Sequence, residues 1–256
     1  MGTSLAPLND LLLFGSLPDM CTTADEKDKE TDLFSYVTTY LEEEVRAEAL
    51  TRNLGAFARF LELAASESGK CINMSKLSQE IGVSQSRIAN YYQILEDCLM
   101  VEKILPYTKN ARRPKLTRAP KYLFFDMGVR RIAAREGLQP SLETMGHLLA
   151  HYVGLELIRE ARLAGPGQQV FFWRDPGGPE VDFVFKNGET LIPIEVKRTA
   201  NPSQADIRHL TIFLNEYEEA TRGYVVCLVP EPRQLSAQIM ALPWQRLGQI
   251  QRGTDL

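Results

Sequence analysis

Several features of common protein classes are missing from this 256-residue sequence. No lysine or arginine precedes Lys27, so the apolar stretch at 11–14 makes a poor signal peptide. No apolar run approaches the ~20 residues of a membrane span. No CxxC pair occurs among the cysteines, which argues against a zinc knuckle or a disulfide framework. We therefore expect reduced thiols in a soluble, cytoplasmic protein that makes no membrane contact.

Local patterns divide the first half of the chain into an irregular segment and a helical region. Residues 1–33 are expected to be irregular, because the stretch CTTADEKDKETD is polar and charged. Helical periodicity starts near Phe34 and returns at 53–69. In SKLSQEIGVSQSRIANYYQILED, two helices meet at Gly82 and Ser84 caps the second, which is typical of a helix-turn-helix. Two strands around a loop follow, so we predict a helical, winged-helix domain over 34–132.

The loop between those strands is the most basic stretch of a chain whose net charge is −4. It contains no acid from Lys109 to Lys121, and such local charge suits phosphate contacts. We predict a nucleic-acid partner, with DNA favoured over RNA. A solvated loop, or a surface that docks on a protein partner, is the alternative. The expected nucleic-acid-binding residues are Ser84, Gln85, Arg87, Asn90, Lys109, Arg112, Arg113, Lys115, Arg118 and Lys121.

The second half of the chain follows the order helix, three strands, helix, strand. A helix is expected over 141–164, where GPG marks its end. A strand at QVFFWRD and a hairpin around Asn187-Gly188 come next. A helix over 202–219 precedes an apolar strand at 223–229 that suits a parallel or mixed sheet. We therefore predict an α/β domain over 140–247.

The hairpin gathers charged residues on one side. With a two-residue turn at 187–188, Asp182 is expected opposite Pro193. Side-chain alternation then places four charged residues on one face: Glu180, Asp182, Glu195 and Lys197. The other face is expected to be a core face made of Val181, Phe183, Phe185, Ile192, Ile194 and Val196.

Three carboxylates and one amine on a strand pair have a chemical interpretation. Like charges across a strand pair are destabilising, and Mg²⁺ prefers carboxylate oxygens as ligands. We predict Asp182, Glu195 and Glu180 as metal ligands. Asp182, Glu195 and Lys197 are the predicted catalytic residues for metal-assisted cleavage of a phosphodiester. The alternative is a solvated sheet face that carries a Glu–Lys salt bridge.

These residues resemble a known family pattern. The strand order and the Asp-x12-Glu-x-Lys spacing resemble the PD-(D/E)XK nuclease-like fold. Asp182 and Glu195 match the first and second acidic positions of that motif, and Lys197 matches its lysine. Residues 5–250 as a whole resemble the C-terminal region of bacterial and archaeal AAA-type ATPases, through segments such as YYQILEDCLMV and FFWRDPGGPEVDFVF. In that family a P-loop module is followed by a winged helix and a domain of unknown function with the nuclease-like fold.

The sequence departs from this family pattern in two places. No G-x-x-x-x-G-K-[S/T] occurs, so no ATP site is expected. Ala150 stands four residues after Gly146, where the nuclease-like fold usually has a helix glutamate. We therefore expect an α+β two-domain protein, in which a helical winged-helix domain precedes an α/β restriction-endonuclease-like domain. The expected function is nucleic-acid binding with Mg²⁺-dependent nuclease activity. The alternative is a catalytically inactive regulatory or protein-interaction module derived from an AAA-type ATPase.

Overall fold

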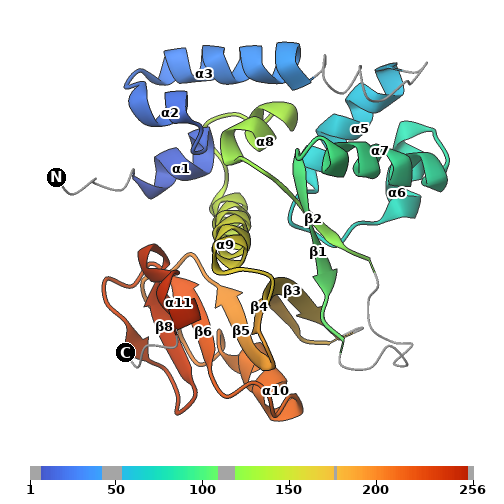
Figure 1. Cartoon of the computed structure of the whole chain (residues 1–256). Helices are drawn as coiled ribbons and strands as arrows, with labels where there is room; N and C mark the ends of the chain where they lie inside the picture. The colour runs from blue at the N-terminus through green and yellow to red at the C-terminus, as the bar shows by residue number, and fades with distance from the viewer. Residues whose placement is uncertain (1–6, 42–53, 109–118, 176–177, 253–256) are drawn as a thin grey trace. The chain divides into compact units, whose positions relative to one another are not determined.

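The computed structural model describes residues 7–41, 54–108, 119–175 and 178–252 and divides into two compact units (Figure 1). Unit 1 contains the chain up to residue 103 together with 121–144, and unit 2 contains 104–120 and the chain from residue 145. The N-terminal part is helical and the C-terminal part has a mixed sheet, as expected for an α+β protein. In the described ranges, no helix combines the length and the apolar composition that crossing a membrane requires.

Unit 1 is mainly helical. Its helices are α1 (Leu8–Phe14), α2 (Pro18–Thr22), α3 (Glu26–Ser35), the π-helical η1 (Tyr36–Leu41), α5 (Leu54–Ser66), α6 (Met74–Ile81), α7 (Gln85–Asp97) and α8 (Met127–Ala133). Strand β1 (Val101–Pro106) begins in this unit beside β2 (Lys121–Phe124). The helix expected from Phe34 onward is observed to residue 41, and the rest of that prediction lies outside the described residues.

Residues 8–35 form three helices, so the prediction of an irregular segment over 1–33 is wrong there. The polar residues of this segment make specific local contacts. The carboxylate of Asp25 caps α3 by accepting hydrogen bonds from the backbone N–H groups of residues 27 and 28. Lys29 is buried with its ammonium 5.0 Å from the ring centre of Phe14, and Leu33 is fully buried. The segment therefore packs as part of unit 1 despite its polar composition.

Two glycines allow α1 and α8 to approach each other closely. Gly15 has φ +79°, and a Cβ there would lie 2.1 Å from a carboxylate oxygen of Asp126. At Gly128, a Cβ would lie 2.2 Å from the carbonyl oxygen of Phe14. The Asp126 carboxylate accepts hydrogen bonds from the backbone N–H of Gly128 at 2.9 Å and of Ser16 at 2.8 Å. No side chain larger than hydrogen fits at either glycine without displacing these groups.

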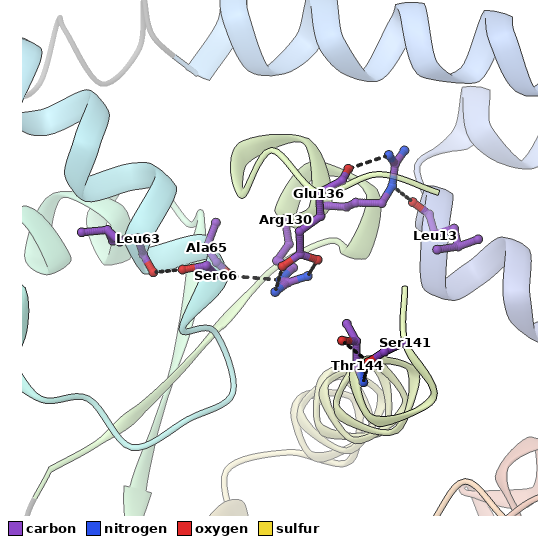
Figure 2. A network of polar contacts seen from close by, with 9 residues as sticks. Leu13, Leu63, Ala65, Ser66, Arg130, Glu136, Ser141 and Thr144 are labelled. Carbon is purple, nitrogen blue, oxygen red and sulfur yellow. Dashed lines mark hydrogen bonds and ion pairs between the residues drawn. The ribbon is translucent and has the colours of Figure 1, made fainter. Parts of the chain in front are cut away.

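Two buried arginines connect α8 to its neighbours. Arg130 pairs with Glu136, and the hydrogen bond from its Nη2 to Oε1 is 2.8 Å long (Figure 2). Arg131 is 1% exposed, donates from Nε to the carbonyl oxygen of Leu13 at 2.6 Å and pairs with Glu30. A buried guanidinium is tolerated only when its N–H groups are paired, so these contacts fix α1 and α3 on α8.

Helices α6 and α7 are joined by a tight turn, as the sequence predicts. Gly82 ends α6 in the left-handed conformation, with φ +78°. The hydroxyl of Ser84 caps α7 by accepting a hydrogen bond from the backbone N–H of Arg87. The inner face of α7 is buried and consists of Ile88, Tyr91, Tyr92 and Leu95.

Unit 2 is built on a mixed sheet in which the end of β1 is followed by β3, β4, β5, β6, β8 and β7. The predicted order of helix, three strands, helix and strand is confirmed, and two further strands follow. The hairpin strands pair antiparallel, whereas β5, β6 and β8 pair in parallel. The elements are α9 (Leu142–Ala164, from residue 145), β3 (Gln168–Arg174), β4 (Glu180–Asn187), β5 (Thr190–Val196), α10 (Arg208–Glu216), β6 (Gly223–Cys227), β7 (Arg233–Gln234), β8 (Ile239–Pro243), η2 (Trp244–Arg246) and α11 (Gln249–Arg252).

Both faces of the hairpin are buried. The predicted core face is confirmed, since all six of its residues are at most 6% exposed: Val181, Phe183, Phe185, Ile192, Ile194 and Val196. On the other face, Val184 and Leu191 belong to a cluster with Leu210 and Phe213 of α10. The charged residues at the open end of the hairpin therefore border a packed core.

Candidate active site

The β4–β5 ladder opens at the point where the acidic residues stand. The last backbone pair toward that end is Phe183 with Ile194. One residue further, a carboxylate oxygen of Asp182 accepts a hydrogen bond of 2.9 Å from the backbone N–H of Val196. An aspartate side chain therefore takes the place of a backbone carbonyl, and the two strands separate beyond it.

The predicted pairing register of the hairpin is wrong by two residues. Val184, and not Asp182, lies opposite Pro193. The reason is the turn, in which Asn187 pairs with Thr190, so that residues 188 and 189 form the two-residue loop. Gly188 has φ +58°, which suits such a turn. Because the error is an even number of residues, the side chains keep their predicted faces.

Glu195 is the most buried member of the charged group, with 5% of its surface exposed. Its Oε1 accepts a hydrogen bond of 2.7 Å from the ammonium of Lys197, which is partly exposed. Its Oε2 is also buried and has no hydrogen-bond partner among the described residues. A buried oxygen without a donor is costly, so this atom has a free coordination position.

The surroundings of Glu195 disfavour its charge. Burial, and then the neighbouring carboxylate of Asp182, raise the pKa of Glu195 to about 8, although Lys197 acts in the opposite direction. Burial alone would lower the pKa of Lys197, but the charges of Glu195, Asp182 and Asp206 outweigh it and raise this pKa. Lys197 is therefore a cation, and the site lacks one positive charge to balance Asp182 and an ionised Glu195.

Glu180 does not join this group. Its side chain is exposed and lies 3.6 Å from the guanidinium of Arg174. Its carbonyl oxygen is 3.0 Å from Nδ1 of His209 on α10. Within the described ranges, no cluster of three or more His, Cys, Asp or Glu side chains is placed to hold a metal ion. The structure thus brings Asp182, Glu195 and Lys197 together and leaves Glu180 at the rim.

A pair of carboxylates still suits Mg²⁺. This ion commonly keeps several waters and uses only one or two protein carboxylates, together with phosphate oxygens of a substrate. The free Oε2 of Glu195 and the carboxylate of Asp182 match that requirement. No arginine in the described ranges pairs with either carboxylate, and Lys197 donates to Oε1 of Glu195. The donor set therefore fits a hard divalent cation.

The helix that could have supplied a further acid does not do so. Ala150 is half-buried on α9 and has no ligating atom. Glu156, on the same helix, pairs with Arg159. Sequence reasoning missed Asp206, whose carboxylate accepts hydrogen bonds from the backbone N–H and the hydroxyl of Ser203, at 2.7 and 2.8 Å. The Ser-x-x-Asp spacing ahead of α10 is a signal that could have indicated this acid.

The predicted nucleic-acid-binding residues fall into two groups. Four are exposed at the start of α7: Ser84, Gln85, Arg87 and Asn90. Lys121 is half-buried at the start of β2. The other five lie outside the described residues: Lys109, Arg112, Arg113, Lys115 and Arg118.

Comparison with known proteins finds two family models and two relatives. Domain of unknown function DUF8612 matches residues 6–140, and domain of unknown function DUF4143 matches residues 145–247. DUF4143 domains are found in proteins associated with AAA-type ATPases. Uncharacterized proteins of Mycobacterium bovis and Mycobacterium tuberculosis are each 26% identical over 203 residues, which cover 79% of this chain and 45% of the relative. The chain spans less than half the length of these curated relatives, and no solved structure matches it.

Proposed function

This chain belongs to the DUF8612 family, and we propose that it binds nucleic acid and that its unit 2 is a metal-dependent phosphodiesterase. The observation that carries the proposal is the buried Glu195, whose Oε2 has no donor among the described residues while Asp182 and Lys197 lie beside it. Pairs of titratable groups with strongly perturbed pKa values are typical of functional sites. We further propose that unit 2 has the PD-(D/E)XK nuclease-like fold, which its strand order supports.

In this proposal, Asp182 and Glu195 would hold the ion from two adjacent strands. An Mg²⁺ ion held there would polarise the phosphodiester as a Lewis acid and would lower the pKa of a water molecule. The backbone N–H of Val196 orients the Asp182 carboxylate by donating to one of its oxygens. The ammonium of Lys197 is held by Oε1 of Glu195, from where it positions the attacking water and stabilises the negative charge that develops on the phosphate oxygens.

Helix α7 of unit 1 would contribute contacts to the nucleic acid. The start of α7 exposes amide and guanidinium groups on Gln85, Arg87 and Asn90, the side-chain types that read base edges in the major groove of DNA. The basic stretch over 109–121, which belongs to unit 2 up to residue 120, would contact phosphates. DNA is therefore the favoured substrate. The DUF4143 match supports an origin in proteins associated with AAA-type ATPases.

A second candidate function is a non-catalytic module that regulates or binds another protein. Ala150 favours it, because a site with two carboxylates holds a metal ion less firmly than a site with three. In that case Glu195 stays protonated. The Asp182 carboxylate then serves only as the last hydrogen-bond acceptor at the end of the β4–β5 ladder.

A cleavage assay separates the two candidates. The purified chain is incubated with plasmid, single-stranded DNA or RNA in Mg²⁺, Mn²⁺ or EDTA, beside the Asp182→Asn and Lys197→Ala variants. We expect cleavage that requires the metal and that both variants lose, since one removes a ligand charge and the other the positioning cation. Glu180→Gln is the matched control, because this exposed acid lies outside the group. Absence of cleavage, or equal cleavage by all variants, would contradict the proposal.

A further inference from the structure

The chain leaves β5 through a bend directly after Lys197. The backbone N–H of Lys197 donates to the carbonyl of Val226 on β6 at 3.0 Å. A regular parallel ladder would continue with a bond from Leu228 to the carbonyl of Lys197. Instead, Leu228 donates to the carbonyl of Thr199 at 2.9 Å, and Thr199 donates back to the carbonyl of Lys197 at 2.8 Å. Arg198 is therefore the central residue of a three-residue turn, closed by the bond from Thr199 to Lys197, which interrupts the β5–β6 ladder directly after the site lysine.

The side chain of Arg198 has no counter-ion within the described part of the chain. Its Nε is buried and makes no hydrogen bond there. No described acid forms an ion pair with its guanidinium, although the residue is only half-exposed. In contrast, the buried Arg130 and Arg131 of unit 1 are fully engaged. A partly desolvated guanidinium without an acceptor is costly, which is expected where a ligand supplies the acceptor.

We propose that Arg198 binds a backbone phosphate of the nucleic-acid strand at the Asp182–Glu195 pair. The inference rests on the proposed function, and it adds a positioning residue next to Lys197. A guanidinium matches phosphate oxygens in geometry and charge, and its planar fork can donate two parallel hydrogen bonds. Arg198 follows the site lysine directly in the chain, at the end of β5 where the Asp182–Glu195 pair stands. Arg198 would thus hold the strand in register, while Lys197 acts at the reacting phosphate.

The test measures binding apart from cleavage. Affinities of single-stranded and duplex DNA oligonucleotides are determined by fluorescence anisotropy in EDTA over a series of salt concentrations. For Arg198→Met we expect affinity to fall about 10- to 100-fold, from the loss of a charge-assisted hydrogen bond. The slope of log affinity against log salt should fall by roughly 0.7 to 0.9, the value of one phosphate contact. Arg198→Lys should restore the slope and only part of the affinity, because lysine keeps the charge and loses the fork.

Matched measurements separate this inference from the proposed function. Arg246→Met is the control, since this arginine pairs with Glu231 and should leave affinity and slope unchanged. The thermal stability of Arg198→Met should equal or exceed that of the wild type, because no described contact is lost and an unpaired, partly buried guanidinium is removed. Wild-type affinity and slope in Arg198→Met would overturn the inference, whether or not the chain cuts DNA. Wild-type binding without cleavage would refute the nuclease alone, and absence of wild-type binding would refute both.

Discussion

Replacing Glu195 by glutamine should change how the stability of unit 2 depends on pH. Burial and the charge of Asp182 raise the pKa of Glu195 from an ordinary 4.5 to about 8. The folded chain therefore holds this proton more tightly than the unfolded chain does. The resulting stabilisation is complete below the unfolded pKa and is lost as pH rises through the folded pKa. Glutamine has no proton to lose, so the variant should lack this dependence.

The size of the effect follows from the two pKa values. Their difference corresponds to a free energy on the order of 5 kcal/mol, at 1.36 kcal/mol for each pH unit between them. Glu195 is only 5% exposed, so solvent screening reduces this value little. Between about pH 5 and pH 8.5, we expect the unfolding free energy of the wild type to fall by roughly 2 to 4 kcal/mol relative to Glu195→Gln.

Urea unfolding followed by tryptophan fluorescence measures this difference. Both tryptophans, Trp173 and Trp244, belong to unit 2, so the signal reports on the unit that contains Glu195. Glu180→Gln is the matched control, because this exposed carboxylate should leave the wild-type pH dependence unchanged. Parallel pH profiles for the wild type and Glu195→Gln would refute the reasoning, since they would mean that Glu195 ionises in its ordinary range.

Two further predictions concern unit 1 and can be checked by chemical unfolding of matched variants. Arg131→Met should destabilise the fold by about 3 kcal/mol, because it removes a buried, paired guanidinium and leaves the Leu13 carbonyl and Glu30 without their donor. Arg135→Met removes an exposed ion pair and should cost less than about 1 kcal/mol. Equal losses would contradict the buried role of the first arginine. Gly15→Ala should cost more than about 3 kcal/mol, because its Cβ meets the Asp126 carboxylate, whereas Gly82→Ala, with open space around it, should show only the ~1–2 kcal/mol of left-handed strain. Similar costs at both positions would show that α1 does not approach α8 as described.

Local rules predict the elements of this fold better than they predict its polar contacts. The Ser84 cap, the Gly82 turn and the buried strand β6 follow from capping, glycine conformation and apolar runs, and all three are confirmed. The helices over 8–35 were missed because their stability depends on distant partners. Arg131 lies 101 residues from Glu30 and 118 residues from Leu13 in the sequence. Local sequence patterns do not predict contacts between residues so far apart.

The candidate site could be predicted in composition but only partly in geometry. The alternation of side chains placed Asp182, Glu195 and Lys197 on one face. This grouping is still correct although the predicted register was wrong by two residues, because a shift of two residues keeps each side chain on its face. The burial of Glu195 could not be foreseen, because it depends on the packing of α10 and β6 against the hairpin. Likewise, Glu180 shares the predicted face but lies where the strands have separated, next to Arg174.

Binding of Mn²⁺ to the purified chain tests the central claim most directly, because it reports on the Asp182–Glu195 pair without a substrate. Electron paramagnetic resonance of free Mn²⁺ gives the number of ions bound to the wild type, Asp182→Asn and Glu180→Gln. We predict one ion for each chain in the wild type and in Glu180→Gln, and loss of that ion in Asp182→Asn. Equal binding by all three proteins, or no binding by the wild type, would contradict the assignment of these two carboxylates as metal ligands.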